Sequence, residues 1–109
     1  MIIATYSLFR KGNDDYKLLY RMFPNQIKDI FLDVQILCNY QMYSNEEFST
    51  LVSCDKQNVI TFDVYDVSET VYSLIKAVEF NRTCKVEKIY IKNIECDVWI
   101  YEKDNVIKN

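Results

Sequence analysis

The stretch that decides the fold runs from Val59 to Glu102 and reads VITFDVYDVSETVYSLIKAVEFNRTCKVEKIYIKNIECDVWIYE. Its spacing predicts a strand, a helix and two more strands, over Val59–Val67, Glu69–Phe80, Cys84–Lys92 and Ile94–Glu102. In the first and last of these segments apolar residues occupy every second position. Because side chains of a strand point alternately to its two faces, the apolar residues lie on one face of the sheet. The apolar face holds Ile60, Phe62, Val64, Ile94, Cys96, Val98 and Ile100.

The helix predicted over residues 69–80 carries one apolar stripe. Its members follow the i, i+3, i+4, i+7 spacing of a helix face. They are Val71, Leu74, Ile75 and Val78. Ser68 is expected to cap the first turn, and Asn81 to end the helix. We expect the stripe to pack on the even-numbered face of the strands, because both surfaces leave water only together.

The N-terminal half is less regular. Residues 2–9 suit a short strand, residues 11–13 suit a turn, and a helix should follow from Asn13 to about Phe23. Residues 26–41 fit either a helix or a strand, and we favour a helix because no turn signal divides the apolar run. The capping box in residues 44–47 predicts another short helix, ending near Ser53.

These segments predict an α+β fold: a small mixed sheet of about four strands with helices packed on one face, in the order β-α-α-(α)-β-α-β-β. The 109 residues are expected to form a single globular domain. Residues 103–109 have little to bury and are expected to fray.

Composition restricts the function. Acidic residues number 16 and basic residues 13, for a net charge of −3. This charge disfavours non-specific binding to nucleic acid or anionic membranes and suits a basic protein partner. The chain holds no apolar run of about 20 residues, and its start lacks a charged leader, so we expect a cytoplasmic protein without a membrane span. The four cysteines lack the spacing of a zinc site. We expect them to be reduced thiols that pack in the core: Cys38, Cys54, Cys84 and Cys96.

The absence of histidine excludes the catalytic and metal sites built on that residue. Carboxylates remain: Asp63, Glu95 and Asp97 would share one sheet face, where paired acids can bind magnesium or exchange protons. The simpler interpretation is that they face solvent. We therefore predict no enzymatic activity, cofactor or metal. The alternative is a carboxylate- or metal-dependent enzyme acting on nucleic acid or a phosphoester.

A second alternative concerns nucleic acid. Lys85, Lys88 and Lys92 accompany Tyr90 on one predicted strand, and aromatic side chains flanked by lysine can stack on bases. Lysines on a hairpin more often keep a sheet edge soluble. We therefore do not expect direct binding to nucleic acid.

The odd-numbered face of the sheet is the predicted protein-binding site. It would bring together Asp63, Tyr65, Glu95, Asp97, Trp99 and Tyr101. Tryptophan and tyrosine are enriched at the centres of interfaces, and acidic side chains attract a basic partner. Trp99 would be the anchor. Two alternatives stay open: Trp99 and Tyr101 face a helical layer made from residues 14–53, or the same face joins copies of the chain.

A small acidic α+β domain, rich in tyrosine and without a catalytic motif, resembles the immunity proteins of bacterial toxin systems, those of contact-dependent growth inhibition in particular. The resemblance is one of size, charge and architecture. It implies a cytoplasmic inhibitor that binds the basic nuclease domain of a toxin. A phage-encoded inhibitor of a host defence protein would have the same features.

Overall fold

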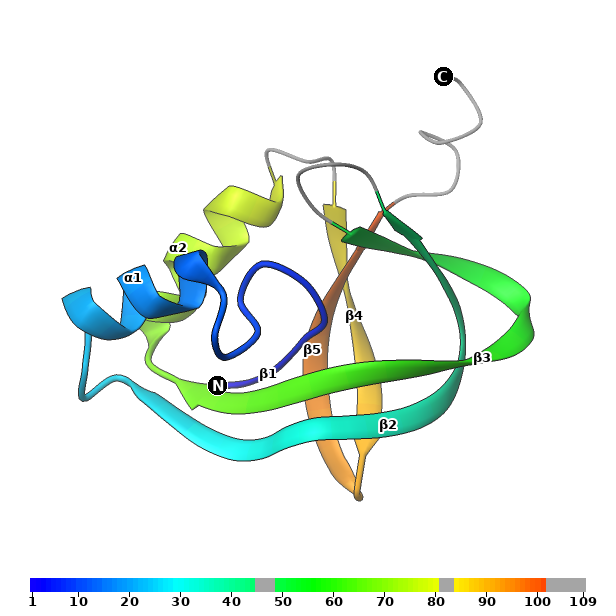
Figure 1. Cartoon of the computed structure of the whole chain (residues 1–109), viewed down its shortest axis with the longest axis horizontal. Helices are drawn as coiled ribbons and strands as arrows, with labels where there is room; N and C mark the ends of the chain where they lie inside the picture. Colours follow the sequence, from blue (N-terminus) through cyan, green and yellow to red (C-terminus); the bar gives the residue numbers. More distant parts are fainter. Residues whose placement is uncertain (45–48, 81–83, 102–109) are drawn as a thin grey trace.

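The computed structural model describes residues 1–44, 49–80 and 84–101 and shows two helices and a five-stranded sheet (Figure 1). The elements are β1 (Ile2–Thr5), α1 (Asp14–Met22), β2 (Ile27–Ser44), β3 (Ser49–Val67), α2 (Glu69–Phe80), β4 (Cys84–Ile91) and β5 (Ile94–Tyr101). The strand order across the sheet is β2-β3-β1-β5-β4. None of the helices described here is long and apolar enough to cross a membrane.

The short strand β1 lies at the centre of the sheet. It is antiparallel to β3 and parallel to β5. The outer pairs, β2 with β3 and β4 with β5, are antiparallel. Because β3 lies between β1 and β2, the segment from β1 through α1 to β2 crosses over one strand before it joins the sheet.

The predicted fold is wrong in its strand count and in its helices. The structure has five strands, and residues 26–41, for which a helix was favoured, lie mostly within β2. The helix expected to end near Ser53 is also wrong, since β3 begins at Ser49. Residues 45–48, which include most of the capping box, lie outside the described residues. The physical reason is the long-range pairing of β2 with β3, which overrides the local pattern.

The even-numbered face of the sheet is covered by strands. The β2–β3 hairpin curls at its far end (Figure 1), and its side chains pack with those of β4 and β5. The Tyr40 hydroxyl of β2 donates to Glu87 Oε1 of β4 at 2.6 Å, which joins two strands at opposite ends of the strand order. This core contains Ala4, Tyr40, Leu51, Ile60, Phe62, Val64, Ile89, Ile91, Cys96, Val98 and Ile100.

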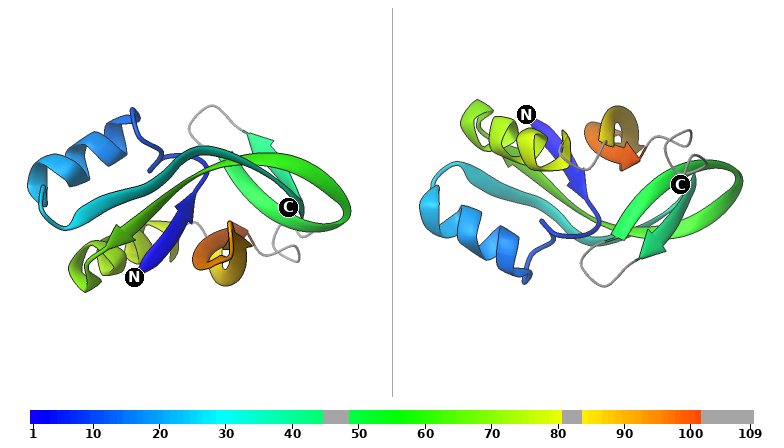
Figure 2. Two further views of the ribbon diagram at one scale, coloured as in Figure 1. Left: turned by 90° about the horizontal axis from the view of Figure 1, so that it is seen from below. Right: turned by 90° about the horizontal axis from the view of Figure 1, so that it is seen from above.

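Both helices contribute to the second core, on the odd-numbered face. The expectation that α2 packs on the even-numbered face is therefore wrong. Val71 and Ile75 join the odd-face core, whereas Leu74 and Val78 of the same stripe remain partly exposed. The reason is that the curled hairpin already covers the other face. Figure 2 shows the ribbons of α1 and α2 apart from one another.

The local predictions over residues 68–80 and 84–101 are confirmed for the helix bounds, its cap and the hairpin. Helix α2 has the predicted bounds, and Ser68 Oγ accepts a hydrogen bond from Val71 N at 3.2 Å. Strands β4 and β5 form the predicted antiparallel hairpin through Lys92 and Asn93. Both turn residues have left-handed backbones, with φ of 50° and 66°. The predicted helix stop, Asn81, lies outside the described residues.

Candidate functional site

Most of the predicted protein-binding face is buried. Trp99 is 4% exposed, and Asp63, Tyr65 and Asp97 are also buried. A partner cannot reach these side chains while the helices stay in place. The remaining members lie nearer the surface: Glu95 is exposed and Tyr101 is partly buried.

Trp99 lies beneath α2. The Tyr72 ring packs on its indole with ring centroids 5.4 Å apart, and the Trp99 backbone carbonyl accepts a hydrogen bond from the Tyr6 hydroxyl at 2.5 Å. Among the described residues, Trp99 Nε1 is the one buried side-chain nitrogen or oxygen without a hydrogen-bond partner. The alternative that helices cover this face therefore agrees with the position of Trp99, although the main cover is α2 rather than residues 14–53.

Asp97 joins the helix to the hairpin. Its Oδ2 accepts a hydrogen bond from the Tyr72 hydroxyl at 2.7 Å, and its Oδ1 forms an ion pair with Lys88. Burial raises the pKa of Tyr72 to about 12, and the hydrogen bond to Asp97 adds to the rise. The Asp97 side chain of β5 thus connects α2 with β4.

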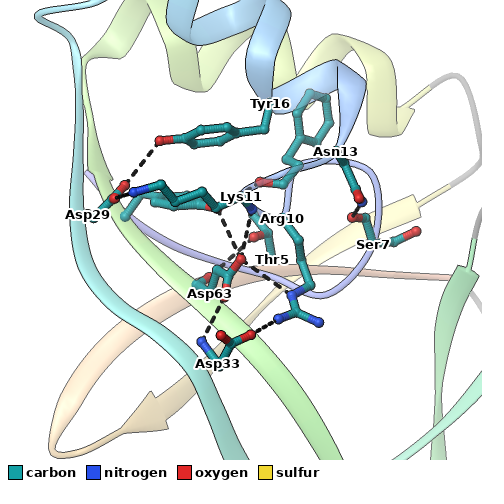
Figure 3. Close-up of polar contacts among 11 residues, drawn as sticks. Thr5, Ser7, Arg10, Lys11, Asn13, Tyr16, Asp29, Asp33 and Asp63 are labelled. Carbon is teal, nitrogen blue, oxygen red and sulfur yellow. Dashed lines mark hydrogen bonds and ion pairs between the residues drawn. The ribbon is translucent and has the colours of Figure 1, made fainter.

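Asp63 is the centre of a larger polar cluster, drawn in Figure 3. It is 1% exposed. Its Oδ2 accepts hydrogen bonds from the backbone N–H of Lys11 at 2.8 Å and from Arg10 Nε at 3.3 Å. Its Oδ1 accepts one from the backbone N–H of Asp33 at 2.8 Å, and the Tyr65 hydroxyl lies 3.3 Å from Oδ2. We call these five residues the Asp63 cluster.

The Asp63 cluster connects segments that are far apart in sequence. Arg10 also pairs with the Asp33 carboxylate, so the loop after β1 is tied to β2 as well as to β3. Asp33 has a left-handed backbone, with φ of 54°, at an irregularity in the β2–β3 pairing. That conformation aims its N–H at Asp63. The cluster fixes the loop on which Lys11 is carried.

An open cavity of about 460 Å³ lies next to the cluster, between α1 and the start of β2. Its wall includes Asp29, whose Oδ2 accepts a hydrogen bond from Lys11 Nζ at 2.8 Å. The Tyr16 hydroxyl donates to Asp29 Oδ1 at 3.2 Å, and the Tyr16 ring stacks on Tyr20 with centroids 6.0 Å apart. Lys28 completes the polar lining. We call this the Asp29 cavity.

Two side chains of the Asp29 cavity, Tyr16 and Lys11, have pKa values that are shifted away from neutral pH. Burial, with help from Asp29, raises the pKa of Tyr16 to about 12. The hydrogen bond to Asp29 raises the pKa of Lys11 above its ordinary value. A general base works best with a pKa near the operating pH, and both groups move away from it.

Two of the three carboxylates proposed for metal binding, Asp63 and Asp97, are separated, whereas Glu95 and Asp97 both lie near Lys88. Asp63 lies opposite Thr5 of β1 and Asp97 lies opposite Ile3, on strands that flank β1 on either side. Because neighbouring strands are about 4.8 Å apart, their Cα atoms are more than about 10 Å from one another. In the part of the chain that the structure describes, no group of three or more cysteine or acidic side chains is placed to hold a metal ion.

The basic strand considered for nucleic acid is largely paired. Lys85 lies 3.7 Å from Glu87, and Lys88 pairs with Asp97. Lys92 lies over the Phe31 ring, 4.6 Å from its centroid. The Tyr90 hydroxyl donates to Glu95 Oε2 at 2.8 Å. The strand therefore presents acidic and basic side chains together.

Helix α1 carries the most exposed apolar side chains near the Asp29 cavity. Leu18 is 53% exposed and Met22 is 56% exposed. Of the nine residues of α1, only Tyr16 is buried. Leu18 and Met22 are four residues apart and lie on one helix face. Tyr20, also exposed, lines the Asp29 cavity on the other side. We call Leu18 and Met22 the α1 surface.

Sequence reasoning missed the α1 surface and three members of the Asp63 cluster, Arg10, Lys11 and Asp33. Lys11 was interpreted as part of a turn, Arg10 was given no role, and Asp33 falls within the segment for which a helix was favoured. One signal was present: Asp33 is an isolated acid in the apolar run from Ile30 to Val34. An isolated polar residue in such a run favours a bulge or a buried polar partner over a regular helix face.

No protein-family model matches the chain, and no curated protein sequence matches it. Among solved structures, the chain is similar to the crystal structure of the uncharacterized protein PH0828 from Pyrococcus horikoshii. The two share 20% sequence identity over 93% of this chain and 77% of that chain, with a TM-score of 0.71. This likeness shows that the fold described above is shared by a solved structure.

Proposed function

We propose that the chain is a cytoplasmic, non-enzymatic inhibitor that binds one protein directly, in the manner of an immunity protein that neutralises a basic, nuclease-type toxin domain. The observation that carries the proposal is the α1 surface. Leu18 and Met22, four residues apart, leave more than half of each side chain in water. Exposed apolar side chains that adjoin one another on a helix face are typical of protein interaction sites.

The composition of this surface fits an interface. Methionine and arginine are enriched at interface centres, and this side of α1 offers Met22 with Arg21 nearby. This proposal replaces the predicted anchor, Trp99, with residues that are exposed before binding.

The charges around the α1 surface are mixed. Asp14 and Asp15 lie in the first turn of α1, whereas Lys17 and Arg21 follow them. Close contact would therefore rest on apolar packing. The net charge of −3 supplies a weak long-range attraction for a basic partner, which affects the association rate more than the affinity.

The internal bonding of the acids supports a role without catalysis. Asp63 and Asp97 are each used in contacts between elements of the fold, and the pKa values of Tyr16 and Lys11 move away from neutrality. No observation on the described residues favours the metal-dependent enzyme over the binding protein.

The test is a quantitative capture experiment with a matched control. Wild type, Leu18→Ala/Met22→Ala and Leu37→Ala would be used as bait in lysates of the source cells, with and without the product of the neighbouring gene. Leu37 is an exposed apolar residue on β2, away from α1. We expect wild type and Leu37→Ala to capture one basic protein in stoichiometric amounts.

The double variant should bind that partner at least about 30-fold more weakly, equivalent to about 2 kcal/mol at a hot spot. Equal binding by all three baits would overturn the α1 site. If wild type captures no partner but hydrolyses a nucleic acid or phosphoester with added magnesium, the inhibitor proposal is wrong.

A further inference from the structure

The Trp99 side chain carries a buried hydrogen-bond donor beneath α2. Trp99 is 4% exposed, and its Nε1 has no hydrogen-bond partner among the described residues. Buried polar atoms of folded proteins are nearly always paired, either with the protein or with an ordered water. The Nε1–H group therefore needs an acceptor that the described side chains do not supply.

A small cavity has Trp99 in its wall. The rest of the wall is formed by residues 4–9, Ser49, Ile75 and Glu79, so the cavity lies between α2 and the segment that follows β1. The space open to the centres of water molecules is about 20 Å³. A buried water needs about 10–15 Å³ by this measure, so the cavity has room for one water and little more. We call it the Trp99 cavity.

Helix α2 contributes a carboxylate to the same wall. Tyr72, Ile75 and Glu79 are spaced by three and four residues, so they share one row of the helix. Tyr72 packs on the Trp99 indole and Ile75 is buried, which shows that this row faces the sheet. Glu79 is the charged member of the row and is partly buried. A charge on the inner row of an amphipathic helix indicates a polar contact beneath the helix, because an uncompensated charge is costly to bury.

The donor and the carboxylate together restrict the chemistry of what the cavity binds. An indole N–H only donates, so its partner must accept a hydrogen bond. A carboxylate only accepts, so the same partner must also donate one. A simple anion would be repelled by Glu79, and a metal ion or an ammonium group cannot accept from the indole. Water both accepts and donates, and it has the right volume.

We propose that the Trp99 cavity binds one ordered water, which accepts a hydrogen bond from Trp99 Nε1 and donates one to the Glu79 carboxylate. Two to four hydrogen bonds are usual for a buried water, and the Ser7 and Ser49 residues of the wall carry further polar groups. A carboxylate has about four acceptor positions, so this bond is compatible with other contacts of Glu79.

The water would attach the last turn of α2 to β5. The first turn is already attached, because the Tyr72 hydroxyl donates to Asp97 of β5 at 2.7 Å. With the water in place, α2 is held to the same strand at both ends by polar contacts. This second contact gives a reason for a carboxylate at position 79, where the pattern of the helix otherwise favours an apolar residue.

The water site is independent of the proposed inhibitor function. It lies under α2, whereas the α1 surface belongs to the other helix, whose ribbon lies apart from that of α2 (Figure 2). Loss of the water would leave capture of a partner by α1 unchanged, and loss of capture would leave the water in place. Failure of one proposal is therefore distinguishable from failure of the other.

The first experiment is NMR spectroscopy of the ¹⁵N-labelled full chain, in which the single tryptophan gives one indole N–H resonance. A water that stays bound for longer than the tumbling time of the protein gives this proton an NOE and a rotating-frame NOE of opposite sign. We expect opposite signs in wild type. Absence of both signals, or equal signs as for surface water or proton exchange, would overturn the proposal.

Substitutions at Glu79 test the second partner. Glu79→Leu removes the acceptor, so the water signal should be lost and the indole proton should shift upfield. Glu79→Gln keeps an acceptor oxygen and should retain the signal. Lys76→Leu, at an exposed position of the same helix, is the matched control and should resemble wild type. An unchanged water signal in Glu79→Leu would overturn the bridge to Glu79.

A high-resolution crystal structure of wild type gives an independent result that needs no variant. We expect one water within about 2.7–3.2 Å of both Trp99 Nε1 and a Glu79 carboxylate oxygen. A direct hydrogen bond between the indole and Glu79, with no water between them, would overturn the proposal.

Discussion

The Tyr72 side chain of α2 contacts Trp99 and Asp97 at once. Its ring packs on the Trp99 indole at an interplanar angle of 48°, and its hydroxyl donates to Asp97 at 2.7 Å. Lys88 of β4 reaches the same carboxylate. Tyr72 therefore connects the helix to β5 by apolar contact and by hydrogen bonding, and the Asp97 carboxylate extends this connection to Lys88 of β4.

The environment of Trp99 leads to the first prediction. Because α2 covers the indole, the fluorescence of this single tryptophan should be strongly protected from acrylamide in the native protein and exposed in urea. Trp99→Ala should lower the free energy of unfolding by about 3–5 kcal/mol, measured by urea denaturation, because it leaves a cavity between helix and sheet. Trp99→Phe should lose less. Strong quenching in the native state would contradict the burial of this face.

The raised pKa values of the Tyr72 and Tyr16 hydroxyls lead to the prediction that the protein loses stability at alkaline pH. The pKa of each hydroxyl is about 12, chiefly because of burial, whereas tyrosine in an unfolded chain ionises near pH ~10. Between these values the unfolded state binds fewer protons than the native state. The free energy of unfolding should therefore fall as the pH rises from about 10 to 12, and this contribution should be intact below pH ~10.

Urea denaturation at stepwise pH measures this effect. Tyr72→Phe removes one titrating hydroxyl, so its stability should decline less steeply across the same interval. At neutral pH it should be about 1–2 kcal/mol less stable than wild type, since Asp97 loses a hydrogen bond but keeps Lys88. An unchanged alkaline slope would show that Tyr72 does not hold its proton in the native state.

Asp63 predicts a large effect from a small substitution. Asp63→Asn keeps the side-chain volume but removes the charge. It also replaces one of the two carboxylate oxygens with an NH₂ group, which is a hydrogen-bond donor. That group would face N–H donors from Arg10 and Lys11 or from Asp33. We expect a loss of at least about 3 kcal/mol in the free energy of unfolding, measured by urea denaturation.

The control for Asp63 is Asp66→Asn on the same strand. Asp66 is half exposed and pairs with the N-terminal ammonium at 3.0 Å. A surface pair contributes at most about 1 kcal/mol, so this variant should stay close to wild type. If both variants lose the same stability, the Asp63 cluster does not have the structural role assigned to it.

Helix α2 and the β4–β5 hairpin could be predicted because local interactions determine them. Ser68 caps the helix through a hydrogen bond within its first turn, and Lys92 and Asn93 form a turn between adjacent strands. These signals lie within a few residues of the structure they produce. The same holds for the alternation that separated the two faces of β5.

The structure of residues 26–41 and the sheet face covered by the helices depend on long-range contacts, which the local sequence pattern does not indicate. Val34, Ile36 and Cys38 alternate as a strand requires, yet Leu37 and the apolar residues before Val34 equally fit a helix. Only the pairing of this segment with β3 decides between helix and strand. In that pairing Val34 lies opposite Phe62, which is more than 20 positions away in the sequence. Alternation along β5 likewise could not show which face the helices would cover, because both faces carry large apolar side chains.

The β4–β5 turn leads to the last prediction. Lys92 and Asn93 both have left-handed backbones, the geometry of a two-residue type I′ hairpin turn, which favours glycine. Asn93→Gly should raise the free energy of unfolding by up to about 1 kcal/mol, because glycine adopts this conformation without a Cβ clash. Asn93→Val should lower it by about 1–2 kcal/mol, since a β-branched residue resists the left-handed region. Gln35→Gly, at an exposed and regularly paired position inside β2, is the control and should lose about 0.5–1 kcal/mol. Thermal and urea denaturation would rank the variants, and a stabilised Gln35→Gly beside a destabilised Asn93→Gly would contradict the turn geometry.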